Sequence, residues 1–70
     1  MNDAPKLDKL AYSLEEFAEA VSLSYAQILR HIANDELIAK YSGRKALILR
    51  AEGERFLRAL PEARAPKVRS

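Results

Sequence analysis

The side chains best suited to a binding role lie in two short stretches, residues 24–30 and 40–45. Arg30 carries paired N–H donors that match the edge of guanine, and Gln27 carries an amide that matches adenine. The second stretch contains three cations. The chain has no cysteine and only one histidine, so it lacks a thiolate nucleophile and the ligand set of a zinc site. We therefore expect binding rather than catalysis, with no enzyme activity, no metal site and no cofactor.

The charge of the chain is uneven along its length. Residues 1–36 carry three basic and seven acidic side chains, a net charge of −4, whereas residues 37–70 carry nine basic and three acidic side chains, a net charge of +6. This asymmetry favours a polyanionic partner for the second half. An uneven solvated surface is the alternative that charge alone leaves open.

Length and composition indicate one small globular domain. A chain of 70 residues, 49% apolar and 31% charged, can bury only a small core. No apolar run approaches the ~20 residues of a membrane span, and the first residues lack the basic and apolar regions of a signal peptide. We expect a cytoplasmic location and no membrane partner.

Two helices are predicted around a short break. Ser13 and Glu16 form a capping box, and a matching pair, Ser24 and Gln27, follows after the break. Behind each box, apolar residues recur at helical spacing, which predicts helices over residues 14–21 and from 25 to about 34. The two apolar sets are Leu14, Phe17, Ala18 and Val21, and then Tyr25, Ile28, Leu29 and Ile32.

The break predicts how the second helix is oriented. A connection of three residues, 22–24, forces the helices to cross steeply, so that the second one projects from the body of the domain. Its outward side then holds Ala26, Gln27, Arg30 and His31, with Ser24 and Tyr25 at its N-terminal end, where backbone amides suit a phosphate. Arg30 as a solvated charge, Tyr25 as a core or cap-packing residue and His31 as a partly packed side chain remain alternatives.

A hairpin and a third helix are expected to complete the domain. Asn34 and Asp35 tolerate the left-handed conformation and close the second helix. Residues 37–41 and 46–50 are rich in strand formers and flank a basic loop at 42–45 that contains Gly43. A helix over residues 52–60 should supply Phe56, Leu57 and Leu60 to the core, weakened by up to ~1 kcal/mol by Gly53.

The order of elements predicts an α+β, mostly α, winged helix-turn-helix fold: helix, turn, recognition helix, β-hairpin wing and C-terminal helix. We expect a flexible lead-in over residues 1–9, the winged helix-turn-helix domain over 10–61 and a disordered basic tail over 62–70, whose deletion should leave the fold intact.

Residues 12 to about 60 resemble the small winged helix-turn-helix proteins of the excisionase family, which are relatives of the MerR DNA-binding domain. The family usually has glycine where this chain has Ser22 and Asp35, and both replacements are turn residues. The positions that carry the resemblance are 13–18, 23–24, 28, 30, 32, 37, 43–45 and 56–57.

The resemblance implies that the second helix reads the major groove of double-stranded DNA and that the hairpin wing touches the adjacent minor groove or backbone. Gly43 would let the backbone approach DNA closely, and Arg44 would suit a narrow, electronegative minor groove. The residues implied at the interface are Ser24, Tyr25, Ala26, Gln27 and Arg30 on the helix, and Lys40, Ser42, Gly43, Arg44 and Lys45 on the wing.

The expected function is sequence-specific binding of double-stranded DNA without catalysis. An excisionase, that is, a recombination directionality factor that shapes DNA for an integrase partner, is one role, and the resemblance adds head-to-tail self-association on DNA. A small transcriptional regulator of the same fold is a second role. An antitoxin or adaptor whose second helix binds a partner protein is the alternative from another class.

Overall fold

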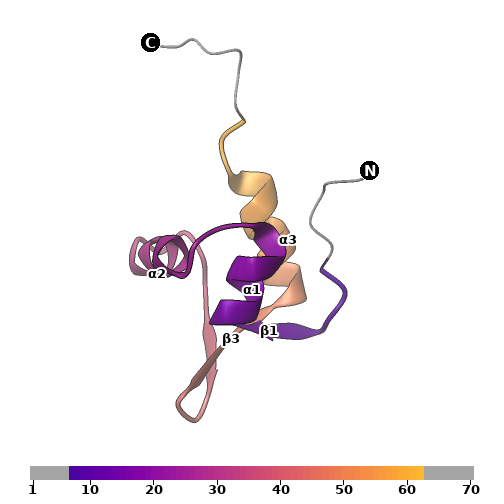
Figure 1. Ribbon diagram of the computed structural model, residues 1–70, viewed down its shortest axis with the longest axis vertical. Helices are drawn as coiled ribbons and strands as arrows, with labels where there is room; N and C mark the ends of the chain where they lie inside the picture. The colour runs from indigo at the N-terminus through magenta and orange to yellow at the C-terminus, as the bar shows by residue number, and fades with distance from the viewer. Residues whose placement is uncertain (1–6, 63–70) are drawn as a thin grey trace.

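The computed structural model describes residues 7–62, in which three helices pack against a three-stranded antiparallel sheet (Figure 1). The α+β class is confirmed, and the arrangement is compatible with a winged helix-turn-helix. The expected basic tail from residue 63 and the lead-in before residue 7 lie outside the described residues. The elements in chain order are β1 (Ala11–Ser13), α1 (Leu14–Val21), α2 (Tyr25–Ala33), β2 (Lys40–Ser42), β3 (Lys45–Leu49) and α3 (Arg50–Ala59).

The sheet contains a strand that the sequence analysis missed. β1 pairs antiparallel with β3, which also pairs with β2, so the strand order is β1-β3-β2 with the longest strand in the centre. β1 is only three residues long and too short to show an alternating pattern. It exists because β3 offers it a partner, with Tyr12 opposite Ile48. This pairing places the start of α1 next to the hairpin.

The hairpin is tighter than predicted. Residues 37–39 are not a strand, and Ser42 and Lys45 pair with each other, which leaves a two-residue turn of Gly43 and Arg44. Gly43 has φ of 62°, the left-handed value that a two-residue hairpin turn requires at its first central position and that glycine adopts without strain. The wing therefore consists of β2, this turn and the first half of β3.

The two predicted capping boxes are confirmed. At α1, Ser13 Oγ accepts from the Glu16 amide at 3.1 Å and Glu16 Oε1 accepts from the Ser13 amide at 2.9 Å. The Ser13 amide, aided by the ammonium group of Lys9, also lowers the pKa of Glu16. At α2, Ser24 and Gln27 make the same pair of hydrogen bonds at 3.0 and 2.9 Å. Each helix thus has its own start signal, as the sequence predicts.

The break between the helices turns the chain sharply. Ser22 adopts the left-handed conformation (φ 65°, ψ 35°), and the Leu23 amide donates to the Ala18 carbonyl at 3.0 Å. In Figure 1, α2 is seen end-on while α1 is seen from its side, so the two helices cross steeply. Asp35, at the end of α2, has φ of 61°. Both left-handed residues occupy the positions where the resembled family usually has glycine.

Replacing Ser22 with glycine should raise the free energy of unfolding by about 0.5–1 kcal/mol. A residue with a Cβ in the left-handed conformation costs about 1–2 kcal/mol, and part of the gain is lost to the greater freedom of glycine in the unfolded chain. Urea unfolding measures the change. The matched control is Ser24→Ala, two residues away, which removes the cap of α2 and should cost about 1 kcal/mol. A Ser22→Gly protein no more stable than the parent would show that the turn is not strained.

The core joins all three helices to the sheet. Its five largest fully buried side chains come from five different segments of the chain: Phe17, Ile28, Leu37, Ile48 and Phe56. The Phe17 and Phe56 rings meet at a centroid distance of 6.1 Å. Leu37, which we expected in a strand, is 1% exposed and fills the core from the loop between α2 and β2. That loop is therefore fixed by burial and not by sheet pairing.

α3 begins two residues earlier than predicted, at Arg50, and ends at Ala59. Its Gly53 is buried against α1: a Cβ added there would lie 2.7 Å from Phe17 Cε1 and 3.1 Å from Leu7 Cδ1. The glycine that should weaken the helix is therefore the one that lets α3 approach α1. Leu7 packs against the core, so the packed part of the chain starts before the boundary at residue 10 that the sequence predicts.

A carboxylate connects the loop before the wing to α3. Glu52 accepts from the Ile38 amide at 2.9 Å and pairs with Arg55 at 2.5 Å. The hydrogen bonds from Arg55, with the Ile38 amide adding to them, lower the pKa of Glu52, and Glu52 in turn raises the pKa of Arg55. The base of the wing is therefore held to the third helix by an ionised carboxylate at neutral pH.

Candidate nucleic-acid interface

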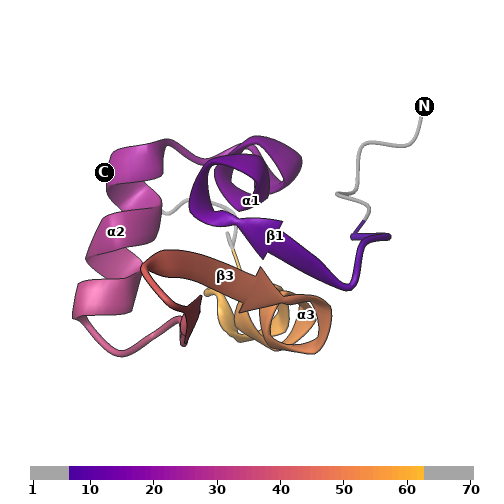
Figure 2. The same cartoon turned by 90° about the horizontal axis from the view of Figure 1, so that it is seen from below.

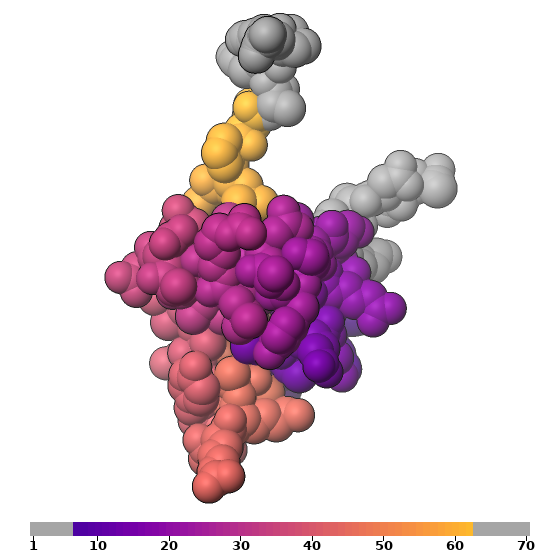
Figure 3. Space-filling model, turned by 60° about the vertical axis from the view of Figure 1, so that its left-hand side comes forward, coloured from indigo at the N-terminus to yellow at the C-terminus, as the bar shows by residue number. Residues whose placement is uncertain are grey.

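α2 presents a long exposed face to solvent. Ile28 is fully buried, and at 100° per residue Ala26 and Arg30 lie nearly opposite to it on the helix. Both are exposed, as is Ala33 one turn further on. In the space-filling view, this helix forms the centre of one face of the molecule, from which the wing projects below (Figure 3). Of the predicted reading face, Ala26 and Arg30 are thus exposed to solvent.

Two residues of the predicted apolar stripe are not in the core. Tyr25 is 47% exposed and Leu29 is 43% exposed, whereas Ile28 and Ile32 pack inward as expected. The period of the stripe was correct, but its width was overestimated, since the small body of the domain covers only the Ile28 side of the helix. Leu29 therefore belongs to the exposed face, and the sequence analysis missed it as a candidate contact residue.

The capping box constrains two of the predicted contact residues. The Ser24 hydroxyl accepts from the Gln27 amide, and Gln27 Oε1 accepts from the Ser24 amide at 2.9 Å. A bidentate contact of Gln27 with adenine requires both its carbonyl oxygen and its NH₂ group. With the oxygen engaged in the box, the NH₂ group of Gln27 is the half that remains to donate outward.

The wing places its polar residues on two faces. Directly opposed residues of an antiparallel pair share a face, and alternate residues along a strand do too. Lys40 lies opposite Leu47, and Ser42 lies opposite Lys45, so Lys40, Ser42 and Lys45 share the outer face of the sheet. Tyr41 lies opposite Ala46 on the other face and is 66% exposed. Tyr41 is a second residue that the sequence analysis missed, although its alternation with two polar neighbours was a usable signal.

A groove connects the wing to the N-terminal end of α2. It has a volume of about 220 Å³ and lies between the starts of α1 and α2 and the turn of the wing, with Tyr25, Arg44 and Glu15 among its lining residues. Two predicted interface residues from distant parts of the chain, Tyr25 and Arg44, therefore share one surface. Glu15 is the acidic member of this groove. The sequence alone gave no reason to place it beside Arg44.

The arginine of α2 and the three cations of the wing make no ion pairs within the part of the chain that the structure describes. The ion pairs found between residues 7 and 62 are Lys9–Glu16, His31–Glu36 and Arg55–Glu52. No acidic residue occurs in α2 or anywhere from β2 to the end of β3. Unpaired surface cations are available to a polyanion without first losing a protein partner. These cations are Arg30, Lys40, Arg44 and Lys45.

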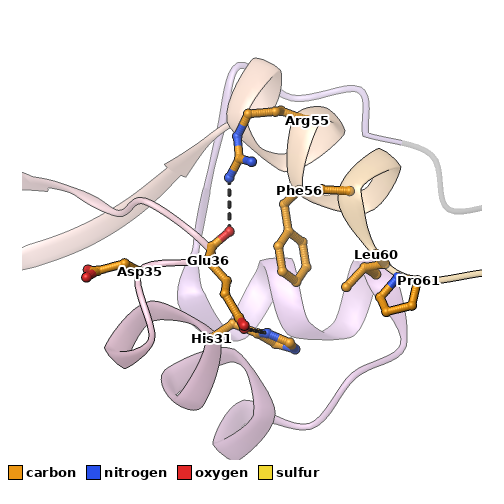
Figure 4. Close-up of a pocket in the computed structure, with 8 residues that line it drawn as sticks. His31, Asp35, Glu36, Arg55, Phe56, Leu60 and Pro61 are labelled. Atoms are coloured by element: carbon orange, nitrogen blue, oxygen red, sulfur yellow. Dashed lines mark hydrogen bonds and ion pairs between the residues drawn. The ribbon is translucent and has the colours of Figure 1, made fainter.

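A larger cavity, of about 470 Å³, lies on the other side of α2, against α3 (Figure 4). His31 Nδ1 is 2.7 Å from Glu36 Oε1, and its ring packs edge-on against Phe56 at 4.9 Å. Arg55 Nη2 donates to the Glu36 carbonyl at 3.0 Å. His31, which we expected on the outward side of α2, is thus partly packed and connects the helix to α3, in agreement with the alternative given for it.

The described residues offer few other candidate sites. Between residues 7 and 62, no group of three or more His, Cys, Asp or Glu side chains is placed to hold a metal ion. None of the helices in the same part of the chain is long and apolar enough to cross a membrane. The surface formed by α2 and the wing is therefore the candidate binding site among the described residues.

Three comparisons were made, and no family model, curated protein or solved structure matches this chain.

Proposed function

We propose that this protein binds double-stranded DNA, with α2 in the major groove and the wing along the adjacent backbone or minor groove. The observation that supports the proposal most strongly is that Tyr25 of α2 and Arg44 of the wing line one groove, and that Arg44 makes no ion pair within residues 7–62. A major groove admits a single helix, and the side of α2 that carries Ala26 and Arg30 is exposed to solvent. A wing beside such a helix reaches the neighbouring phosphates.

Within DNA binding, the resemblance to the excisionase family favours a recombination directionality factor that binds repeated sites and shapes DNA for an integrase. A small transcriptional regulator of the same fold is the alternative role. Footprinting on the DNA that flanks the native gene distinguishes the two, because repeated sites beside a recombination attachment site would support the first and a single promoter site the second.

A protein-interaction module is the second candidate function, and the exposure of Tyr25 and Leu29 favours it. An apolar helix face of this kind can bind in the groove of a partner protein. The affinity for DNA should fall steeply with salt if phosphates are bound, since each neutralised phosphate contributes about −0.9 to the slope of log K against log salt. Salt-independent binding of a protein partner, with no measurable DNA binding, would favour the interaction module.

Replacing Lys45 with alanine should weaken binding to all DNA sequences about equally. Lys45 lies on the outer face of the wing and does not line the groove between the wing and α2. We therefore expect it to contact a phosphate and not a base edge. The slope of log K against log salt should become shallower by about one unit. Fluorescence anisotropy on two unrelated duplexes at several salt concentrations measures both quantities.

The control for this experiment is Lys9→Ala. Lys9 is also an exposed lysine, but it pairs with Glu16 at 3.0 Å, beside β1 and away from the wing. Its loss should leave the slope unchanged. If Lys45→Ala relaxed the preference at one base pair and left the slope as it was, Lys45 would be a base reader and the proposed division between wing and helix would be wrong.

A further inference from the structure

The exposed face of α2 is mainly apolar. Going around the helix axis in one direction from the buried Ile28, Leu29 lies at about 100°, Ala33 at 140°, Ala26 at 160° and Arg30 at 200°. All four are exposed, and Arg30 is the only charged one. A face that reads bases by hydrogen bonds alone would carry more donors and acceptors than this.

The apolar strip of α2 consists of Leu29, Ala33 and Ala26. The contacts of the helix show on which side of Arg30 this strip lies. Tyr25 lines the groove beside Arg44, and Leu29 follows one turn later on the same side of the helix. His31 lies on the other side, against Phe56 of α3. The apolar strip therefore lies on the wing side of Arg30. In Figure 2, α2 lies at one side of the molecule and runs across the direction of β3.

We infer that α2 recognises the C5-methyl groups of pyrimidines in the major groove, with Leu29 and Ala26 as the residues that contact them. This inference rests on the proposed DNA binding. Thymine presents its methyl group in the major groove beside a single acceptor, and apolar side chains are suited to bury it. 5-Methylcytosine presents the same methyl group beside a donor. The helix thus reads a methylated pyrimidine on the wing side of the base pair that Arg30 contacts.

The charges around α2 favour DNA over a protein partner as the occupant of this face. Arg30 adjoins the apolar strip on one side, and Arg44, which lines the groove with Tyr25, lies on the other. Neither makes an ion pair within residues 7–62, and the first turn of α2 carries no acidic residue. The methyl groups of the major groove are apolar spots between two rows of phosphates. An apolar strip beside a cationic wing matches this pattern of charge. Glu15 also lines the groove and is the acidic side chain among its lining residues.

The test begins by selecting duplexes that bind the protein from a chemically synthesised pool with a random centre. One enriched duplex is then made again with deoxyuridine in place of thymine, one position at a time. This change removes a methyl group and leaves every hydrogen-bonding group of the base edge in place. The affinity of each duplex is measured for the parent protein, for Leu29→Ala and for the control Leu10→Ala, which removes an 80% exposed leucine from the chain just before β1.

The parent should bind about fourfold more weakly for each contacted methyl that is removed, the fold-change that corresponds to ~0.8 kcal/mol for one buried carbon. Leu29→Ala should lose this discrimination at one position, whereas Leu10→Ala should retain it. Where the selected site contains cytosine, 5-methylcytosine at a contacted position should bind more tightly than cytosine, which would assign recognition to the methyl group and not to the thymine ring.

Two results would overturn the inference and leave DNA binding in place. In the first, the parent binds thymine and deoxyuridine duplexes equally. In the second, Leu29→Ala discriminates between them as well as the parent does. The first comparison uses only the parent protein, so it tests the inference even if Leu29→Ala fails to fold. If no duplex is enriched and binding to DNA has no salt dependence, the proposed function itself is wrong, and the apolar strip belongs to a protein interface.

Discussion

Replacing Gly53 with alanine should lower the free energy of unfolding by about 1–2 kcal/mol, although alanine is the better helix former. Helix propensity alone would stabilise the protein by up to about 1 kcal/mol. Against this, the added Cβ would lie 2.7 Å from Phe17 Cε1, closer than such contacts allow, and overpacking of a filled core costs about 1–3 kcal/mol. Chemical denaturation measures the difference.

The clash at Gly53 cannot be relieved by a small movement of Phe17. The ring is 0% exposed and is held between Tyr12 at 6.3 Å and Phe56 at 6.1 Å, so α3 itself must shift. Phe17→Leu removes the ring atoms that the new methyl would meet at 2.7 and 3.4 Å, and leaves the contact with Leu7 Cδ1 at 3.1 Å. The double variant Phe17→Leu with Gly53→Ala should therefore lose less stability than the sum of the two single losses. A rise in stability for Gly53→Ala alone would show that the helices are less closely packed than the structure indicates.

Replacing Arg30 with alanine should cost about 1–3 kcal/mol of specific DNA binding, the value of one good bidentate contact with guanine. Arg30 lies about 200° from the buried Ile28 on α2, nearly opposite to it, is exposed and makes no ion pair with another described residue. As an exposed substitution, it should change the free energy of unfolding by less than about 0.5 kcal/mol. A binding titration on a footprinted site and thermal unfolding of the same protein measure the two effects.

Arg58→Ala is the matched control for Arg30→Ala. Arg58 is also an exposed arginine in the last turn of its helix, but that helix is α3. Its removal lowers the net charge by the same amount and should leave sequence preference intact. Equal losses of DNA affinity for the two variants would show that Arg30 contributes only general electrostatic attraction. A large fall in the stability of Arg30→Ala would instead make Arg30 a structural residue.

Arg30 and the apolar strip of α2 are expected to contact different chemical groups of the DNA. Arg30 selects a base by hydrogen bonds, whereas Leu29 and Ala26 would select a methyl group by burial. Their effects on affinity should therefore separate by position in the site. A deoxyuridine substitution that lowers the affinity of the Arg30→Ala protein as much as that of the parent would show that the contacts are independent.

Several local features of this protein follow from the sequence by itself. The capping boxes at Ser13 and Ser24 predicted where α1 and α2 begin, because the serine hydroxyl and the Glu or Gln side chain three residues later each accept from the other residue's backbone amide. Gly43 predicted the hairpin turn for a similar local reason. Features of this kind depend on neighbours a few residues apart in the chain, so the sequence is enough to find them.

Other features were decided only by the tertiary structure. β1 is a strand because β3 lies beside it, and Leu37 is a core residue because it packs with buried residues from the helices and the sheet. Gly53 is required by its distance from Phe17, and Leu29 is exposed because the domain is too small to cover its side of α2. Each of these depends on residues more than ten positions away, and their separation in space is set by the packing of the whole domain and not by any local pattern.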